Sequence, residues 1–443
     1  MPAWHHGPAV IDPIGRNPPA RRLAGIWLAE GHVPLNALTY LYAAFISVGL
    51  LAFVSFMQAY LLNVNLGLPP TLQGRAVSGL NFANELVAIC LVAPLGALAD
   101  KIGRRAVYAC GFLWLAAGFV LYPLARTLPQ LTGCALFFSV GVAAIGTMLG
   151  TVLADTPRED SRGRLVGIAG VCQGLGAFAF VITLGKAPQW LMSLGLDDLA
   201  AGRITMWIAA ALCAVSAAIV FAGLRRGTPS ARAPSLPLAR IVGDGMTAAR
   251  RNPRIWYAWL LQFGSFGDRV VLGTFLSLRL QQGWLEQGVD MADATARARV
   301  PYSVAMGAGL VTALVVGVLL DRFDRLRIGV AAMALAAPAY LLCGFFGDAD
   351  QGAILLAVAA LLGVGQVAAV LVGQTLLGEE APRDVRGAVF GLAGICASAG
   401  ILFTNAAGGW LYDTVARGAP FFLLGAVNFA IFLVGLWIAR RAD

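Results

Sequence analysis

Twelve apolar runs, each about long enough to cross a lipid bilayer, dominate the sequence between residues 37 and 439. A helix needs roughly 20 mostly apolar residues to span the hydrocarbon core. Only helices and closed barrels can do so, because every backbone polar group must find a partner within the protein. We therefore predict an all-α membrane protein. The expected transmembrane spans are 37–62, 76–99, 105–125, 130–153, 164–185, 203–223, 255–278, 299–320, 328–347, 352–376, 388–411 and 420–439.

Charged residues make up only 12% of the 443 residues, about half the proportion in soluble domains. So few charges cannot cover a soluble globule of this size, which excludes an ordinary soluble enzyme and a disordered chain. All three histidines precede the first span, and the seven cysteines lie inside apolar runs without a CxxC spacing. We therefore expect the cysteines to be small core residues, and we expect no metal site, no cofactor and no enzymatic activity.

The positive charges are distributed unequally between the two sides of the predicted helices. Of the 32 Lys and Arg residues, 23 fall in segments on the same side as both termini and eight on the other side. The positive-inside rule then places both termini in the cytoplasm, and it explains the net charge of +9 without nucleic-acid binding. Within the linker between spans six and seven, residues 238–251 predict a short amphipathic helix on the membrane surface. The expected parts are a cytoplasmic tail (1–36), a six-helix bundle (37–223), a cytoplasmic linker (224–254), a second six-helix bundle (255–439) and a cytoplasmic end (440–443).

Two passages recur in both halves of the chain. GALADKIGRR, which starts at Gly96, is echoed by GVLLDRFDR, which starts at Gly317. PREDSRG and the following GIAGVCQGLG, which starts at Gly167, are echoed by PRDVRG and GLAGICASAG, which starts at Gly391. The offsets of 221 and 224 residues are both close to half the length of the chain, which indicates a duplicated, pseudo-symmetric six-helix bundle. We expect the glycines of the second pair of passages to allow close helix packing.

The passage GALADKIGRR after the second span, together with its echo after the eighth, resembles the signature loop of the major facilitator superfamily. The resemblance covers about residues 37–440. It implies two bundles around a central cavity lined by spans one, four, seven and ten. It also implies transport of a small solute by alternating access around a site at the middle of the membrane.

Asp100 lies where the second span is expected to end at the cytoplasmic face. Its carboxylate can meet the positive end of another helix or pair with Arg104 or Arg105. The resemblance implies a gating contact between Asp100 and the start of span eleven, near Gly387, and a matching contact between Asp321 and span five, near Gly163. Alternatively, these charges merely mark cytoplasmic loops. The gating candidates, with two glycines expected at a tight turn, are Gly96, Asp100, Gly103, Arg104, Arg105, Arg162, Asp321, Arg325 and Arg386.

Three ionisable residues, Glu85, Asp268 and Arg269, lie at the predicted middle of the membrane. Such residues are costly to bury and are therefore candidates for function. A carboxyl group held away from water can take up a proton near neutral pH, and Arg269 can hold an anionic solute or pair with a carboxylate. We assign these residues to proton coupling or substrate binding and consider Glu85 with Arg269 the pair to test. The alternative is a static ion pair that joins two helices.

The resemblance also indicates uncharged polar side chains that can line the cavity, although hydrogen bonding between helices is an alternative for each. These are Gln58, Thr151, Gln262, Gln366 and Gln374. Two features of many drug–proton antiporters are missing, because Phe137 stands where they have an arginine and Leu175 follows Gly174 where they have a proline.

These observations together predict a secondary active transporter of a small organic solute in the inner membrane. The chain has no phosphate-binding GxxxxGK[ST] stretch, so we expect coupling to protons rather than to ATP. We expect a monomer and slightly favour export. The alternatives are a proton-coupled uptake symporter and a transport-inactive receptor or scaffold with the same fold.

Overall fold

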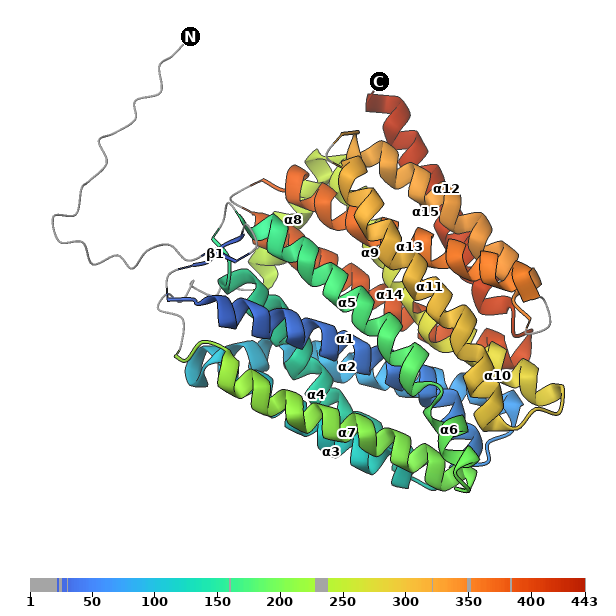
Figure 1. The fold of residues 1–443 in the computed structure, drawn as a ribbon. Coiled ribbons are helices and arrows are strands. Elements are labelled where there is room, and N and C mark those ends of the chain that lie inside the picture. Colours follow the sequence, from blue (N-terminus) through green and yellow to red (C-terminus); the bar gives the residue numbers. More distant parts are fainter. Residues whose placement is uncertain are drawn as a thin grey trace, which may run out of the picture.

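The computed structural model describes residues 22–23, 26–29, 31–158, 161–227, 238–320, 322–348, 352–382 and 385–442. Apart from one short hairpin, the described elements are helices that form two bundles (Figure 1). The first bundle contains α1 (Pro34–Val64), α2 (Pro70–Ile102), α3 (Arg104–Leu121), the 3₁₀ turn η1 (Tyr122–Leu124), α4 (Leu128–Asp155), α5 (Arg162–Leu184), the short α6 (Ala187–Ser193) and α7 (Asp198–Gly223).

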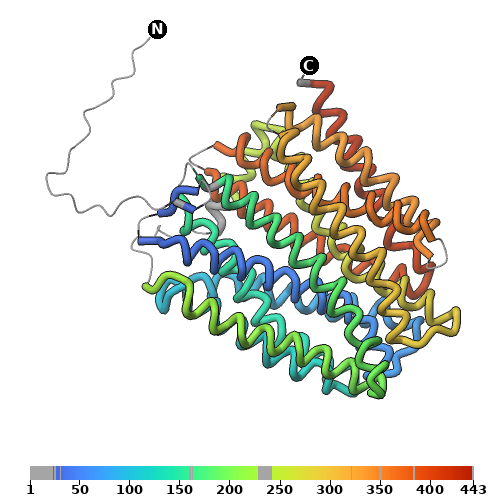
Figure 2. The backbone as a smooth tube through the Cα atoms, viewed as in Figure 1, coloured from blue at the N-terminus to red at the C-terminus, as the bar shows by residue number. Residues whose placement is uncertain are grey.

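The second bundle follows helix α8 (Leu238–Arg251), which occupies the residues predicted for the amphipathic helix. Its elements are α9 (Pro253–Val270), the π-helix η3 (Val271–Leu276), α10 (Ser277–Glu286), α11 (Met291–Leu320), α12 (Arg325–Phe346), α13 (Gly352–Glu380), α14 (Arg386–Thr414) and α15 (Ala419–Ala442). Along the tube in Figure 2 the second bundle, yellow to red, lies beside the first, blue to green.

Eleven helices in the described ranges are long and apolar enough to cross a membrane, and they match eleven of the predicted spans. The remaining span, predicted at 255–278, is continuous through α9, η3 and α10, but it is not a regular α-helix. The apolar periodicity of this span does not predict the π-turn at Val271–Leu276. One widened turn leaves the spacing of apolar residues within the α-helices on either side unchanged.

Local sequence signals explain several helix boundaries. Thr127 accepts a hydrogen bond from the backbone N–H of Gln130 (3.4 Å) at the start of α4. Gly103 has φ +94° and joins α2 directly to α3, as expected for a glycine at a tight turn. The matching expectation for Gly96 is wrong. Helix α2 continues through Gly96 to Ile102, and a Cβ at Gly96 would meet Thr147 only at 4.0 Å.

The internal duplication in the sequence is also present in the packing. In the first bundle, Gly176 of α5 lies so close to α1 that an added Cβ would overlap the carbonyl oxygen of Phe45. In the second bundle, Gly400 of α14 lies equally close to the carbonyl oxygen of Phe263 in α9. The two glycines are the last residues of the repeated passages GIAGVCQGLG and GLAGICASAG, so each bundle uses the same close helix crossing. Not all the glycines of these passages pack in this way, because a Cβ at Gly394 would meet nothing within 4 Å.

The two bundles are joined at the end opposite the chain termini, which we call the far end. There the Asp413 carboxylate of α14 accepts hydrogen bonds from the backbone N–H groups of Gly74 (3.0 Å) and Arg75 (2.8 Å) in α2. Arg299 of α11 donates to the carbonyl oxygen of Ile182 in α5 (2.8 Å). The opposite end, where α5 and α14 begin, we call the termini end.

Part of the predicted N-terminal tail is folded against the first bundle. Strands β1 (Arg22–Leu23) and β2 (Ile26–Trp27) form a short antiparallel hairpin. The chain then lies along the loop between α4 and α5, where Ala29 donates to the carbonyl of Thr156 (3.0 Å) and Arg158 donates to that of Trp27 (2.9 Å). We call residues 26–29 the strap.

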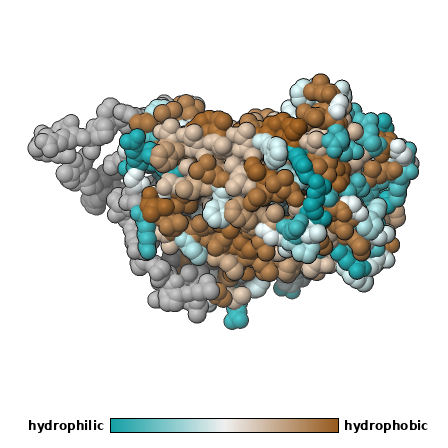
Figure 3. All heavy atoms as spheres, turned by 90° about the horizontal axis from the view of Figure 1, so that it is seen from below, coloured by the Kyte–Doolittle hydropathy of each residue, from teal (hydrophilic) through white to brown (hydrophobic). Residues whose placement is uncertain are grey.

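The surface is consistent with a protein surrounded by lipid. On the face in Figure 3, hydrophobic residues cover the middle, and hydrophilic residues gather toward the two ends. Large apolar side chains such as Val311 and Phe345 are 60% and 67% exposed, so they are available to lipid. The expectation that all cysteines are core residues is wrong, because Cys90 and Cys110 are exposed on this helical surface.

Candidate functional site

A cavity of about 280 Å³ lies between the two bundles. The residues that line it recur every three or four positions, which places them on one face of each helix. Helix α1 contributes Leu51, Val54, Ser55 and Gln58; α2 contributes Asn81, Asn84, Glu85 and Ala88; η1 and α4 contribute Tyr122, Phe138, Ser139 and Val142. The second bundle contributes Phe266, Arg269 and Val270 from α9, Gly273 and Thr274 from η3, and Ile401 and Asn405 from α14.

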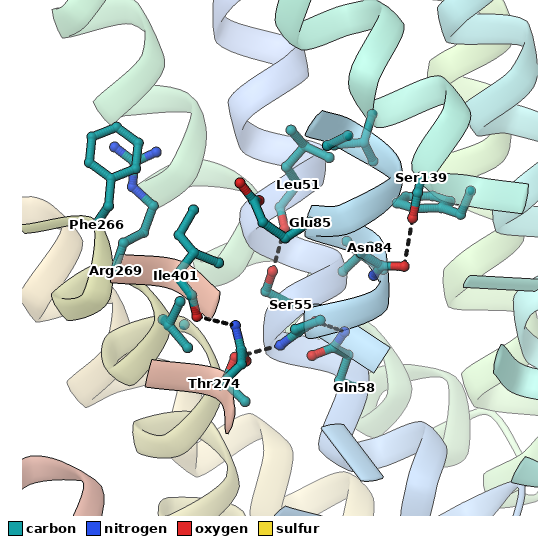
Figure 4. Close-up of a pocket in the computed structure, with 18 of the residues that line it drawn as sticks. Leu51, Ser55, Gln58, Asn84, Glu85, Ser139, Phe266, Arg269, Thr274 and Ile401 are labelled. Atoms are coloured by element: carbon teal, nitrogen blue, oxygen red, sulfur yellow. Dashed lines mark hydrogen bonds between the residues drawn. The ribbon is translucent and has the colours of Figure 1, made fainter. Parts of the chain in front are cut away.

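Two opposite charges face this cavity from opposite bundles (Figure 4). Glu85 projects from α2 and lines the cavity. Arg269 projects from α9, and its guanidinium lies 4.4 Å from the centre of the Phe266 ring. The two charges interact electrostatically, but no ion pair of Arg269 is formed among the described residues. In this conformation the pair is therefore not a closed salt bridge.

Asp268 does not line the cavity, although it is adjacent to Arg269 in the sequence. Its side chain is fully buried, and its two carboxylate oxygens accept hydrogen bonds from Asn428 of α15 at 2.9 and 3.1 Å. Its backbone carbonyl accepts a hydrogen bond from Tyr340 of α12 (3.2 Å). Asp268 thus ties α9 to its neighbours inside the second bundle, whereas Arg269 points out of that bundle.

A chain of amide and hydroxyl groups crosses the cavity between the bundles. Gln58 of α1 donates to Asn81 of α2 (2.9 Å), and Asn81 donates to Thr274 in the π-turn of the second bundle (2.9 Å). A separate contact joins α4 to α2, where the Ser139 hydroxyl lies 2.6 Å from the side-chain amide of Asn84. The π-turn therefore supplies a hydroxyl that contacts the other bundle directly.

Only Gln58 among the five predicted cavity side chains lines this cavity. The other four are Thr151, Gln262, Gln366 and Gln374. Gln262 and Gln366 are 4% and 7% exposed, and Gln366 donates to the carbonyl of Ser265 (3.5 Å), so they pack between α9 and α13. Thr151 donates to the carbonyl of Thr147 one turn earlier in its own helix (3.0 Å).

The sequence analysis overlooked several cavity residues, of which Ser139, Phe266 and Thr274 are the most informative. A signal for two of them was present. The spacing of the cavity residues in this span, by one, three and four positions, is that of a single helical face. These residues are Phe266, Arg269, Val270, Gly273 and Thr274. Asp268 does not belong to that face.

At the termini end, each bundle holds its own charges together. Arg104 lies 3.5 Å from Asp100 and also pairs with Asp155 at the end of α4. Arg325 pairs with Glu379 at the end of α13. Arg104 and Arg325 occupy equivalent positions in the repeated passages GALADKIGRR and GVLLDRFDR, so these two ion pairs are related by the internal repeat.

The expected contact of Asp100 with the other bundle is not formed in this conformation. Asp100 lies next to Arg104 of its own bundle, and a Cβ placed at Gly387 or at Gly163 would meet nothing within 4 Å, so nothing packs against these two glycines. The physical reason is that the bundles meet at the far end. Asp321 and the side chain of Arg162 lie outside the described residues.

The two remaining gating candidates also stay within their own bundles. Arg105 lies over the ring of Phe221 in α7, at 4.1 Å from its centre. Arg386 donates to the carbonyl of Gly378 in α13 (2.9 Å).

Curated relatives match most of this chain. Magnetosome protein MamH from Paramagnetospirillum magneticum is 26% identical over 430 residues, which is 93% of this chain and 94% of that protein. Magnetosome protein MamZ from Magnetospirillum gryphiswaldense is 24% identical, and this chain spans 59% of its length. Multidrug resistance protein MdtH from Sodalis glossinidius is 27% identical over 77% of this chain and 79% of that protein.

Solved structures share the fold at low sequence identity. A variant of the nucleoside transporter NupG superposes with a TM-score of 0.70 at 13% identity, over 91% of this chain and 99% of that chain. A bacterial homologue of the human lysosomal transporter Spinster, in an inward-facing and unoccupied conformation, gives a TM-score of 0.65 at 15% identity, over 93% and 96% of the two chains. The family model "Major Facilitator Superfamily" matches residues 37–292 and 298–443. This chain is therefore a multi-pass membrane protein that belongs to the Major Facilitator Superfamily, a family of transporters and not of enzymes.

Proposed function

We propose that this protein is a secondary active transporter that moves a small organic solute through the cavity between its bundles by alternating access. The observation that carries the proposal is the pair Glu85 and Arg269, which face one cavity from opposite bundles without forming an ion pair. Both charges are open to the cavity and are not paired with each other, so each is available to a solute or a proton. A solute or proton that satisfies these charges therefore changes the free energy of bringing the bundles together.

The bundles are in contact at the far end, through Asp413. If both termini are cytoplasmic, as the distribution of positive charges favours, these contacts support an inward-facing conformation. In that orientation the far end is periplasmic, and it is closed by the hydrogen bonds that Asp413 accepts from Gly74 and Arg75. To open it, the bundles would rock about the cavity and close the termini end, where Asp100 would then reach the start of α14. The same proposed gate includes Gly103, Arg104, Arg105, Arg162, Asp321, Arg325 and Arg386.

For proton coupling we propose Glu85 rather than Asp268. Glu85 faces the cavity, where protons can exchange, whereas Asp268 is enclosed by its own bundle. A carboxyl group that alternates between a proton and a solute couples the two in opposite directions. This mechanism favours export driven by protons, and the similarity to a protein named for multidrug resistance supports it. Uptake by proton symport is the alternative direction.

We place the protein in the inner membrane as a monomer. The similarity to MamH along almost the whole of both chains favours a second candidate location, the magnetosome membrane. Fractionation of the native cells distinguishes the two locations.

The test of transport uses purified protein in liposomes with an imposed pH gradient and a panel of metabolites and drugs. We expect gradient-dependent flux of at least one solute, and we expect Glu85→Gln to uncouple that flux from the gradient. Asp268→Asn serves as the matched control, since it removes a second acidic group at similar depth but outside the cavity. Flux with the same pH dependence in Glu85→Gln would contradict coupling through Glu85. Absence of flux for every solute would favour the receptor or scaffold alternative.

A further inference from the structure

Taking the proposed transport function as its basis, we propose that the substrate is a small zwitterion. Its anionic group binds Arg269 of the second bundle, and its protonated amine binds Glu85 of the first bundle. The inference concerns the chemical class of the solute and depends on the arrangement of donors and acceptors in the cavity.

The donor side of the cavity is Arg269. Its side chain is exposed to the space between the bundles, and the Phe266 ring supports one face of the guanidinium. Arginine carries five N–H donors in a planar fork that matches a carboxylate or a phosphate. Among the described residues these donors have no hydrogen-bond acceptor, so the group is available to an anion.

The acceptor side of the cavity is the carboxylate of Glu85, and two amide oxygens are enclosed beside the cavity. The side-chain oxygens Oε1 of Gln58 and Oδ1 of Asn405 are buried and have no hydrogen-bond partner among the described residues. Both residues line the cavity. Buried acceptors without a partner are rare in folded proteins. An ammonium group carries three donors and no acceptor, which suits the Glu85 carboxylate.

The other charge classes fit this cavity less well. A simple anion at Arg269 would be repelled by Glu85, and a simple cation at Glu85 would be repelled by Arg269. A neutral solute would displace water from Glu85 and Arg269 without offering either of them an opposite charge. The free energy of that desolvation would then not be compensated. A zwitterion satisfies both charges, and it does so across the gap between the bundles.

The cavity volume of about 280 Å³ indicates a compact solute. We therefore choose five small probes that differ only in charge and length. Three are zwitterions with increasing separation of their charges: alanine, 3-aminopropanoate and 4-aminobutanoate. Two carry a single charge: butanoate and butylamine.

The experiment measures the thermal stability of the full-length protein in lipid nanodiscs at increasing concentration of each probe. We expect at least one zwitterion to bind about tenfold or more tightly than butanoate and butylamine, because each charged contact is worth that much in affinity. Equal or tighter binding of either single-charge probe would overturn the proposal. So would the failure of all three zwitterions to raise the melting temperature.

Two substitutions test whether Glu85 binds the amine and Arg269 binds the anionic group. The readout is which probe each variant prefers, so a partial loss of stability does not affect the result. Glu85→Gln removes the negative charge that repels anions. The tightest-binding probe of this variant should therefore change from the zwitterion to butanoate. Arg269→Gln should shift the preference to butylamine. Asp268→Asn should keep the preference of the unsubstituted protein, because its side chain faces α15. Unchanged preferences in the first two variants would contradict the assignment.

Failure of this inference is distinguishable from failure of the proposed function. If liposomes transport a solute that lacks one of the two charges, the protein is a transporter and the zwitterion assignment is wrong. If liposomes transport no solute at all, the proposed function itself is wrong.

Discussion

Side chains of adjacent residues on a helix point about 100° apart. As a result Asp268 contacts Asn428 inside the second bundle, whereas its neighbour Arg269 faces the cavity. Asp268→Ala removes the acceptor for the Asn428 side chain, so one buried amide loses its partner. We expect a loss of roughly 1–3 kcal/mol in the free energy of unfolding, seen as a lower melting temperature in detergent. The control is Asp197→Ala, which changes an exposed carboxylate at the far end. Equal melting temperatures for the two variants would show that Asp268 does not stabilise the bundle.

At the scale of helices, the crossings at Gly176 and Gly400 bring backbones so close that no side chain fits between them. Gly400→Ala places a Cβ against the carbonyl oxygen of Phe263, so α14 must move away from α9. We expect destabilisation of roughly 1–3 kcal/mol, measured as a lower melting temperature. Gly394→Ala is the matched control in the same helix, because its Cβ would meet nothing within 4 Å and should be tolerated. A Gly400→Ala protein as stable as Gly394→Ala would contradict the close packing.

At the scale of the whole molecule, Asp413 fastens the bundles at the far end through two backbone hydrogen bonds. Asp413→Ala removes both acceptors, so we expect more molecules with the far end open. Spin labels on the far ends of α2 and α14 should report a longer distance between the bundles. Glu286→Ala is the control, because Glu286 pairs with Arg417 inside the second bundle. An unchanged distance distribution in Asp413→Ala would show that this contact does not hold the far end closed.

Asp100 belongs to the same scale, because its proposed partner lies in the other bundle. Asp100→Asn removes the charge that would meet the start of α14 when the termini end closes. We expect slower transport with normal membrane insertion and melting temperature. Full transport activity in Asp100→Asn would show that the charge has no part in gating.

The sequence by itself was sufficient to predict the transmembrane helices, the duplication and the tight turn at Gly103. These features depend on local chemistry: a bilayer demands a certain apolar length and internal hydrogen bonding, and a left-handed turn favours glycine. Eleven spans match the described helices for this reason. Glu85 and Arg269 were identified in the same way, since ionisable residues at that depth stand out in any apolar run.

Only the tertiary structure decided which partners these residues contact. It turned Asp268 toward α15, enclosed Gln262 and Gln366 between helices, and brought Thr274 to Asn81 through a π-turn. It also placed the strap on the α4–α5 loop and left Asp100 with Arg104 instead of α14. The rotation of each helix, and the end at which the bundles meet, follow from packing between residues far apart in the chain. Local periodicity indicates which residues share a face of one helix, but it does not indicate which distant helix that face meets.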